Sequence, residues 1–486
     1  MSQPEPVLIR SARDVTDLVN SGAARGSHAT MIVIIALGGI FIDAYDFSSL
    51  AYGMRDITVQ FGLSPVGAGI VNASIMVGAV VGALGGGYLV DKIGRYRVFM
   101  ADMLFFVIAA LGCALAPNAE VLVVFRFLMG VGVGMDLPVA MAFLAEFSRL
   151  RGKGSKGSRT ASWSAAWFVA TSACYLIILG LYFLIPAENH GVLWRFTVGF
   201  GAVPALVVLL IRHRYMNESP AWAAGQGDLE GAAAILRKSY GVNAVVAPEA
   251  KIVKAPKRSI RAEFGRLFNR TYRRRTWLSL AVALAQTFGY NAVAYGLPVI
   301  IAGFLAQGPL TTISASLVLN VCFAVTGGLL GIRWVRSQGA WKLTALGFAV
   351  QFAALVALAL IGRPSGQELA VAALLALGAF LFAQGWGPGA NYMTFATLSY
   401  PTSLRGVGVG FNQGMLRIGS TASLFLFPVL SASLGTGVFW VIALAPALGL
   451  LALLLVRWEP VGYDVDAEDS ETEKGGVPTD PAETRR

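Results

Sequence analysis

Residues 87–97 read Gly-Tyr-Leu-Val-Asp-Lys-Ile-Gly-Arg-Tyr-Arg and separate two long apolar runs, 66–90 and 97–116. Glycines in such a segment let neighbouring helices approach closely. Asp91 can accept hydrogen bonds from backbone or arginine donors. A charged segment between two apolar runs of about 20 residues indicates a tight loop between two membrane-spanning helices.

Apolar runs of the same length recur along all 486 residues, of which 56% are apolar and 13% are charged. An ordinary soluble domain has about 25% charged residues. Because backbone groups in lipid must be satisfied internally, runs of this length predict helices rather than barrel strands. The sequence therefore predicts an all-α membrane protein with twelve transmembrane helices, at residues 29–54, 66–90, 97–116, 120–144, 160–185, 194–212, 276–304, 310–332, 341–362, 367–398, 406–430 and 435–457.

Basic residues collect in alternate loops, and the segment from Arg212 to Arg275 holds fourteen Lys or Arg against five Asp or Glu. Positive loops stay on the cytoplasmic side, so this pattern predicts that both termini lie in the cytoplasm. The same rule accounts for the net charge of +11, and we expect no nucleic acid as a partner. Arg outnumbers Lys by 29 to 9, which is typical of a bacterial source and hence of the cytoplasmic membrane.

Five segments follow from this pattern. They are a cytoplasmic N-terminal segment (1–28), a six-helix half (29–212), a basic central loop (213–275), a second six-helix half (276–457) and an acidic tail expected to be disordered (458–486). One further helix is expected in the central loop, around residues 228–240. Six spans on each side of a long loop suggest two repeats. Each chain then holds a complete pathway, which favours a monomer.

Several motifs resemble the major facilitator superfamily, and they cover nearly the whole chain. The segment at 87–97 is similar to the signature loop of that superfamily, whereas the equivalent segment, Arg333 to Gly339, lacks the acid. Other motifs resemble the branch of sugar porters and metabolite:proton symporters. These are Arg126-Phe-Leu-Met-Gly130-Val-Gly132, Glu146 with Arg151-Gly152, Asn217-Glu218-Ser219-Pro220, the stretch from Gln286 to Tyr295, Gly385-Trp386-Gly387-Pro388, and the stretch from Tyr400 to Gly406.

The resemblance implies the major facilitator fold and a set of gating residues at the cytoplasmic side. These are Gly87, Asp91, Lys92, Gly94, Arg95, Arg97, Glu146, Arg151, Glu218 and Arg405. Two departures bear on the substrate. Trp163 and Trp167 stand where a sugar porter usually has a glutamine, which disfavours a hexose. Asp43-Ala-Tyr45-Asp46, with Asp136 in the fourth span, is more similar to phosphate:proton symporters and to niacin or aromatic-acid carriers.

Ionisable side chains inside a span cost at least roughly 2.5 kcal/mol each, so each is a functional candidate. Four of them in the first half are the candidates: Asp43, Asp46, Arg126 and Asp136. At about 1.5 Å per residue, Asp46 and Arg126 both fall in the outer half of the membrane, with Asp136 about 15 Å deeper. Asp46 and Arg126 are the predicted proton switch, because a charged arginine stabilises a nearby carboxylate. The alternatives are a permanent ion pair between them, or Asp136 as the protonated group.

The substrate site is expected near the membrane midplane between the two halves. Gln286, Tyr290, Asn291 and Tyr295 lie close to one helical face, although buried amides also form hydrogen bonds between membrane helices. Further candidates are Trp386, Asn391, Arg417, Trp163 and Trp167. Arg417 lies about 16 Å deep, which favours an anionic substrate over a contact at the cytoplasmic gate.

These observations predict a proton-coupled symporter of a small organic or aromatic acid anion, working by alternating access. Its partners are the substrate, protons and the lipid bilayer. The alternatives are a sugar or phosphate:proton symporter, a proton-independent facilitator or efflux carrier, or a transporter-like solute receptor. The spans contain no nucleophile–base pair, metal-ligand cluster or phosphate-binding loop, so we expect no enzyme activity, metal or cofactor.

Overall fold

The computed structural model describes residues 6–20, 29–147, 156–250, 260–305, 308–401, 404–463 and 465. By packing, the chain divides into two compact units. Unit 1 comprises Met1–Asp46, Ser74–Gly154 and Trp194–Lys257, and unit 2 comprises Phe47–Ala73, Ser155–Leu193 and Arg258–Arg486. These bounds follow contacts within each unit, and the two six-helix halves drawn from the sequence stay a prediction.

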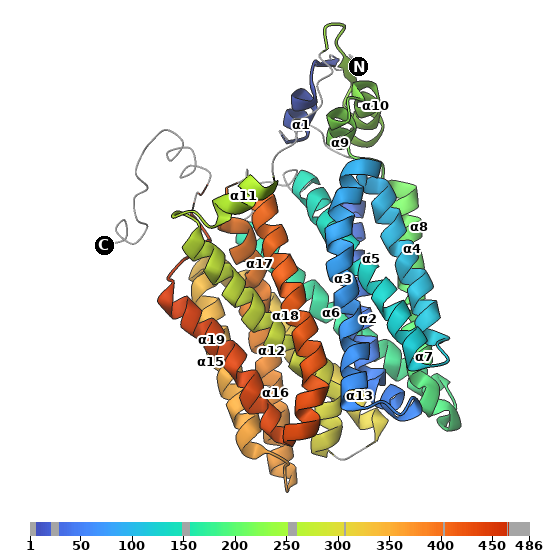
Figure 1. Cartoon of the computed structure of the whole chain (residues 1–486), viewed down its shortest axis with the longest axis vertical. Helices are drawn as coiled ribbons and strands as arrows, with labels where there is room; N and C mark the ends of the chain where they lie inside the picture. The colour runs from blue at the N-terminus through green and yellow to red at the C-terminus, as the bar shows by residue number, and fades with distance from the viewer. Residues whose placement is uncertain are drawn as a thin grey trace. The chain divides into compact units, whose positions relative to one another are not determined.

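Helices make up most of the described backbone (Figure 1). Those that lie at least partly in unit 1 are α1 (Ala12–Asn20), α2 (Ala29–Gln60), α3 (Pro65–Ile93), α4 (Arg95–Ala114), α5 (Ala119–Phe147), α7 (Leu193–Phe200), α8 (Ala202–Tyr215), α9 (Pro220–Gly225) and α10 (Leu229–Tyr240). The others are α6 (Lys156–Leu184), η2 (Ala187–Val192), α11 (Ile260–Leu267), α12 (Arg273–Leu305), α13 (Pro309–Leu319), η3 (Asn320–Val325), α14 (Thr326–Gln338), α15 (Ala340–Ile361), α16 (Gln367–Trp386), α17 (Pro388–Leu398), α18 (Arg405–Leu434), η4 (Gly435–Gly437) and α19 (Val438–Leu455).

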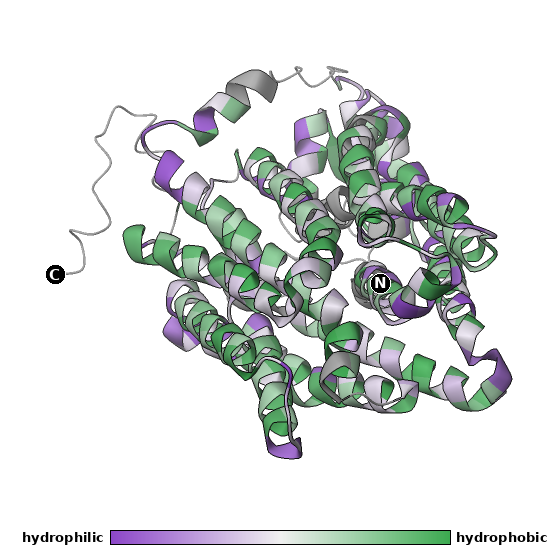
Figure 2. Cartoon of the chain, turned by 60° about the horizontal axis from the view of Figure 1, so that its bottom comes forward, coloured by the Kyte–Doolittle hydropathy of each residue, from purple (hydrophilic) through white to green (hydrophobic). Residues whose placement is uncertain are grey.

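Every one of the twelve apolar runs expected from the sequence is helical. Three of them are interrupted, at Gly201, at the π-helical turn η3 and at Gly387. Length and composition alone qualify eight stretches of the described residues as able to cross a membrane, one of which, Arg405–Leu455, contains both α18 and α19. Apolar residues predominate along the long helices, and hydrophilic ones gather near helix ends and connections (Figure 2).

Glycines bring α3 and α5 into backbone contact in unit 1. Gly78 and Gly82 are four residues apart on α3, and Gly130 and Gly134 repeat this spacing on α5. A Cβ atom at any of the four would overlap a backbone carbonyl oxygen of the opposite helix. Small residues at this spacing let membrane helices pack closely. The crossing fixes α5, which carries two of the predicted proton-coupling residues.

The Gly82→Ala variant is expected to be destabilised by about 1–3 kcal/mol, because the added methyl group forces α3 and α5 apart. Gly85→Ala is the matched control on the same helix, since no atom lies within 4 Å of the Cβ position there. That control gains only helix propensity, roughly 1 kcal/mol. Thermal unfolding of both purified variants in detergent measures the difference. Equal stability would contradict a tight α3–α5 crossing.

The N-terminal segment and the central loop form a small domain within unit 1. β1 (Val7–Ile9) pairs in parallel with β2 (Ala244–Val246). Apolar side chains of α1, α9, α10 and the two strands close over a common core. Its buried members are Ile9, Val15, Ala223, Ala224, Leu229, Ala232, Ala233, Leu236 and Ala244. The sequence did not predict this pairing, because the two strands are short and far apart in the chain.

The helix expected in the central loop around residues 228–240 is confirmed as α10. Its buried residues follow the spacing i, i+3, i+4, i+7 of an amphipathic helix. Asp228 caps its start by accepting a 2.7 Å hydrogen bond from the backbone N–H of Gly231. Most of the acidic tail expected at 458–486 lies outside the described residues.

Candidate functional site

Asp46 and Arg126, the predicted proton switch, are both buried in unit 1. Arg126 of α5 acts electrostatically on Asp46 of α2. Gly201, between α7 and α8, leaves room for the carboxylate, because a Cβ there would come within 2.7 Å of Oδ1 of Asp46. The hydroxyl of Tyr45 donates a 2.7 Å hydrogen bond to the carbonyl oxygen of Thr197 and so ties this part of α2 to α7. The fold therefore buries both charged groups in unit 1, within electrostatic range of each other.

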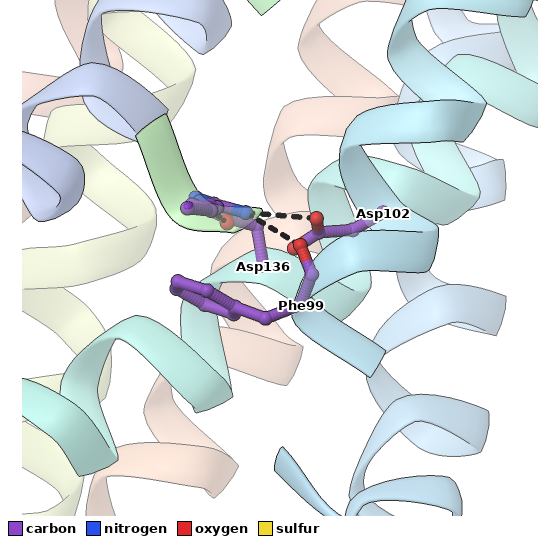
Figure 3. Close-up of polar contacts among 4 residues, drawn as sticks. Phe99, Asp102 and Asp136 are labelled. Atoms are coloured by element: carbon purple, nitrogen blue, oxygen red, sulfur yellow. Dashed lines mark hydrogen bonds and ion pairs between the residues drawn. The ribbon is translucent and has the colours of Figure 1, made fainter. Parts of the chain in front are cut away.

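Asp136 forms an ion pair with Arg212 of α8 (Figure 3). This agrees with the expectation that Asp136 lies too far along α5 from Arg126 to be its partner. Nη2 of Arg212 donates to Oδ1 of Asp136 at 2.7 Å, and Nη1 donates to Oδ1 of Asp102 at 2.8 Å. Nη1 also donates to the carbonyl oxygen of Phe99 at 2.9 Å, and the guanidinium lies over the Phe99 ring. We call Asp102, Arg212 and Asp136 the buried triad.

Sequence reasoning missed two members of the buried triad. Asp102 carries a signal in the sequence, because an acid within an apolar run is a functional candidate. Arg212 stands where the run 194–212 meets the basic loop, and an arginine at such a junction usually extends its charge to the membrane surface. Its side chain is instead fully buried. Asp43, the remaining predicted proton-coupling residue, is also buried.

Glu218, one of the predicted gating residues, binds the backbone of the signature segment at 87–97. Gly94 has a φ of +98° and precedes α4, where a Cβ would overlap the Glu218 carboxylate. Oε1 of Glu218 accepts a 2.8 Å hydrogen bond from the backbone N–H of Arg95, and both its oxygens accept from that of Tyr96. The carboxylate thus satisfies unpaired N–H groups at the helix start and complements the helix dipole.

Unit 2 contains the same arrangement at the start of α15. Gly339 has a φ of +82°, and a Cβ there would overlap the carboxylate of Glu459. That carboxylate accepts hydrogen bonds from the backbone N–H groups of Ala340 and Trp341, at 3.0 and 2.9 Å. Glu459 follows the last span as Glu218 follows the sixth, and each carboxylate accepts from the first backbone N–H groups of a helix that a glycine with positive φ precedes. This repetition supports an internal repeat.

Arg405 closes the end of α17, since it donates to the carbonyl oxygens of Thr397 and Tyr400 at 2.9 and 3.3 Å. Lys92 and Arg97 are exposed. The structure does not describe the side-chain surroundings of three other predicted gating residues, Gly87, Asp91 and Glu146. A fourth, Arg151, lies outside the described residues.

Seven of the described aromatic residues of unit 2 form one contact network, the aromatic cluster: Phe47, Trp163, Trp167, Phe168, Tyr290, Tyr295 and Tyr392. Trp163 and Trp167 stack at 5.3 Å between ring centres, and Tyr392 meets Trp163 edge-on at 5.7 Å. The indole N–H of Trp167 donates a 2.8 Å hydrogen bond to the Tyr290 hydroxyl. Phe47 contacts both Trp167 and Tyr295. Four of the predicted substrate residues are thereby brought together.

Gln286, a fifth predicted substrate residue, belongs to a chain of amides between helices. Nε2 of Gln351 donates to Gln384 at 2.7 Å, and Nε2 of Gln384 donates to Gln286 at 2.8 Å. This fits the alternative of interhelical hydrogen bonding. The Trp386 ring contacts Trp334, and its Nε1 has no hydrogen-bond partner among the described residues.

Arg417 of α18 is buried and lies within electrostatic range of Tyr392. A buried guanidinium beside the aromatic cluster suits a carboxylate, which it can bind through two parallel hydrogen bonds. Asn391 is buried, and its Oδ1 has no hydrogen-bond partner among the described residues. Asn291 donates to Thr287 on its own helix at 3.4 Å. The candidate substrate residues of unit 2 thus combine aromatic faces, amides and the cation of Arg417.

Comparison with known proteins identifies the family. The model of the family described as sugar (and other) transporter matches residues 31–465. The chain belongs to this family. Its predicted place in the major facilitator superfamily, and an all-α fold with twelve membrane-spanning helices, are confirmed. The protein is a multi-pass membrane transporter.

Its relatives include bacterial transporters of similar length. The inner membrane metabolite transport protein YgcS of Escherichia coli is 29% identical, covering 88% of this chain and 90% of that protein. The niacin transporter NiaP of Acinetobacter baylyi is 26% identical, covering 82% and 85%. A partially occluded inward open structure of the E. coli xylose transporter XylE aligns with a TM-score of 0.71 at 18% identity, covering 89% and 98%. At that identity it shows the fold alone.

Proposed function

We propose that the protein is a proton-coupled symporter of a small aromatic or other organic acid anion, working by alternating access. The aromatic cluster carries this proposal. Its rings offer flat faces to a planar solute, and edge-to-face or offset ring contacts add about 0.5–1.5 kcal/mol each beyond the area that they bury. Arg417 supplies a buried cation near Tyr392 for the carboxylate. Niacin, named for one relative, is itself an aromatic carboxylic acid.

Proton coupling is proposed to act through Asp46 and Arg126. The guanidinium keeps its charge, so it stabilises the Asp46 carboxylate while the two are close. A conformational change that separates them withdraws this stabilisation and lets the carboxyl bind a proton. Substrate and proton then cross together, because the change of conformation depends on both.

Sugar:proton symport is the second candidate, and the amides favour it. Gln286, Gln384 and Asn391 present donors and acceptors of the kind that bind hydroxyl groups. The family is described as transporting sugars and other solutes. The two candidates differ in what Trp163 and Trp167 do, and in whether Arg417 meets a negative charge.

Uptake into proteoliposomes tests the proposal. A labelled panel of nicotinate, benzoate, an aliphatic acid, phosphate, glucose and xylose is offered with and without an inward proton gradient. Gradient-driven accumulation of the aromatic acids supports the proposal, and accumulation of the sugars alone favours the second candidate. If uptake of every solute were the same with and without the gradient, the protein would be a facilitator and the proposed proton coupling would be wrong.

Trp167→Ala is expected to weaken binding of an aromatic acid about tenfold, because it removes a stacking surface together with the bond to Tyr290. Trp440→Ala is the matched control, since that indole is 48% exposed on α19 and lies outside the aromatic cluster. Binding is measured by calorimetry on purified protein. A Trp167→Ala variant that binds the acid as tightly as the control would exclude this ring from the site.

A further inference from the structure

We propose that the buried triad is a second site for a transported proton, separate from Asp46 and Arg126. The inference deepens the proposed function, since it concerns how protons cross during symport. It arises from three side chains on three helices of unit 1, α4, α5 and α8. All three are buried, and two ion pairs of 2.8 and 2.7 Å join them.

The charges of the triad do not balance when both acids are ionised. Two carboxylates then face one guanidinium, and arginine keeps its proton throughout the accessible pH range. A net charge held in the membrane is unfavourable, and groups in such places neutralise it by binding or releasing a proton. One proton on either acid leaves a single carboxylate paired with Arg212. The site is therefore built to hold one proton.

The hydrogen bonds of the triad leave one carboxylate oxygen that can carry this proton. Oδ1 of each acid is used by Arg212, whereas Oδ2 of Asp102 has no hydrogen-bond partner among the described residues. Because both Oδ1 atoms bind the one guanidinium, at 2.8 and 2.7 Å, the carboxyl groups of Asp102 and Asp136 lie close to each other. A proton taken from water turns one carboxylate into a carboxylic acid, whose O–H donates to the other. No bond other than O–H forms or breaks.

Two members of the triad lie toward an end of their helices. At 1.5 Å per residue, Asp102 is about 10 Å along α4 from its first residue, and Arg212 is about 5 Å from the last residue of α8. Among the described residues of α2, Gly39 lies against the triad, because a Cβ there would come within 2.5 Å of Oδ2 of Asp136 and 3.3 Å of Nη2 of Arg212. Asp43, four residues further along α2, is the next acid on that helix.

Asp102→Asn tests the site, because asparagine keeps the acceptor for Arg212 and cannot gain or lose the proton. The first readout needs no substrate. Infrared difference spectra of the purified protein are recorded across a pH titration, for the native protein and for Asp102→Asn. A titrating carboxylic-acid band that disappears in the variant supports the proposal. The same band in both proteins, or no titrating band in either, overturns it.

The second readout is the dependence of accumulation on the gradient. With the membrane potential held at zero, each coupled proton raises the equilibrium accumulation about tenfold per pH unit. Labelled nicotinate is the probe. Asp102→Asn is expected to lower the slope of log accumulation against pH difference by one, with Asp136→Asn as a second variant. Glu120→Gln, an exposed acid on α5, is the control.

The outcomes separate the two proposals. A native slope of zero removes the proposed proton coupling, whatever the infrared band shows. A native slope that Asp102→Asn leaves unchanged overturns only the second proton site, and the triad is then a permanent tie between three helices. Thermal unfolding of each variant establishes that it is folded before its slope is compared.

Discussion

The Arg212→Leu variant is expected to lose about 3–5 kcal/mol of unfolding free energy, because it leaves two buried acids without their cation. Arg212 also donates to the backbone of Phe99 and packs on its ring. The substitution therefore removes three hydrogen bonds and a cation–π contact at once. Each remaining acid must take up a proton or stay charged in an apolar setting, and both outcomes are unfavourable.

Two buried cysteines allow the loss of unfolding free energy to be measured. Cys113 and Cys174 are buried and Cys322 is exposed, so a thiol-reactive dye reports unfolding in a Cys322→Ala background. Arg214→Leu is the matched control: that arginine is exposed two residues further along α8. A surface substitution of this kind is expected to stay within about 0.5 kcal/mol of the native stability.

A triple variant tests whether the lost stability comes from unpaired charge or from lost packing. Combining Arg212→Leu with Asp102→Asn and Asp136→Asn removes all three charged groups, and this variant is expected to regain part of the lost stability. If Arg212→Leu were as stable as Arg214→Leu, the two ion pairs would contribute nothing to folding. If the triple variant were no better than Arg212→Leu, the loss would come from packing and the Phe99 contacts.

The membrane helices were predictable because each depends on its own residues. Twenty apolar residues in a row must form a helix in lipid, so the run 341–362 alone predicts α15 (Ala340–Ile361). That Trp163 and Trp167 share one helical face was predictable too, because they lie four residues apart on one helix. Their contacts with Tyr290 and Tyr392 could not be predicted, because these residues come from distant parts of the chain.

The rest of the site depends on pairings that a local pattern does not contain. Arg212 sits at the edge of a basic loop, where only the fold decides whether its charge faces water or Asp136. Glu459 follows the last span in an acidic tail, and nothing nearby shows that it caps α15. β1 is three residues long, so its partner, β2, is fixed by tertiary packing rather than by β propensity.

Asp46→Asn is expected to abolish accumulation driven by a proton gradient, a loss of at least about tenfold per pH unit. Asparagine has the shape of the protonated acid but cannot release a proton, so the change of conformation no longer depends on one. Exchange of substrate across the membrane should continue, since that step requires only the substrate site. Counterflow and gradient-driven uptake of labelled nicotinate, measured in the same proteoliposomes, separate the two effects.

Asp56→Asn is the control for this prediction, because it removes an acid from the same helix near its end. Asp46→Asn should differ from Asp102→Asn as well. Asp46 controls the change of conformation, so without it the proton on the triad crosses independently of substrate and coupling is lost completely. Asp102→Asn only lowers the slope by one proton. Accumulation that persists in Asp46→Asn would make Asp46 and Arg126 a permanent ion pair that only joins α2 to α5. The proton would then have to be carried elsewhere, and the buried triad in unit 1 would be the next site to remove.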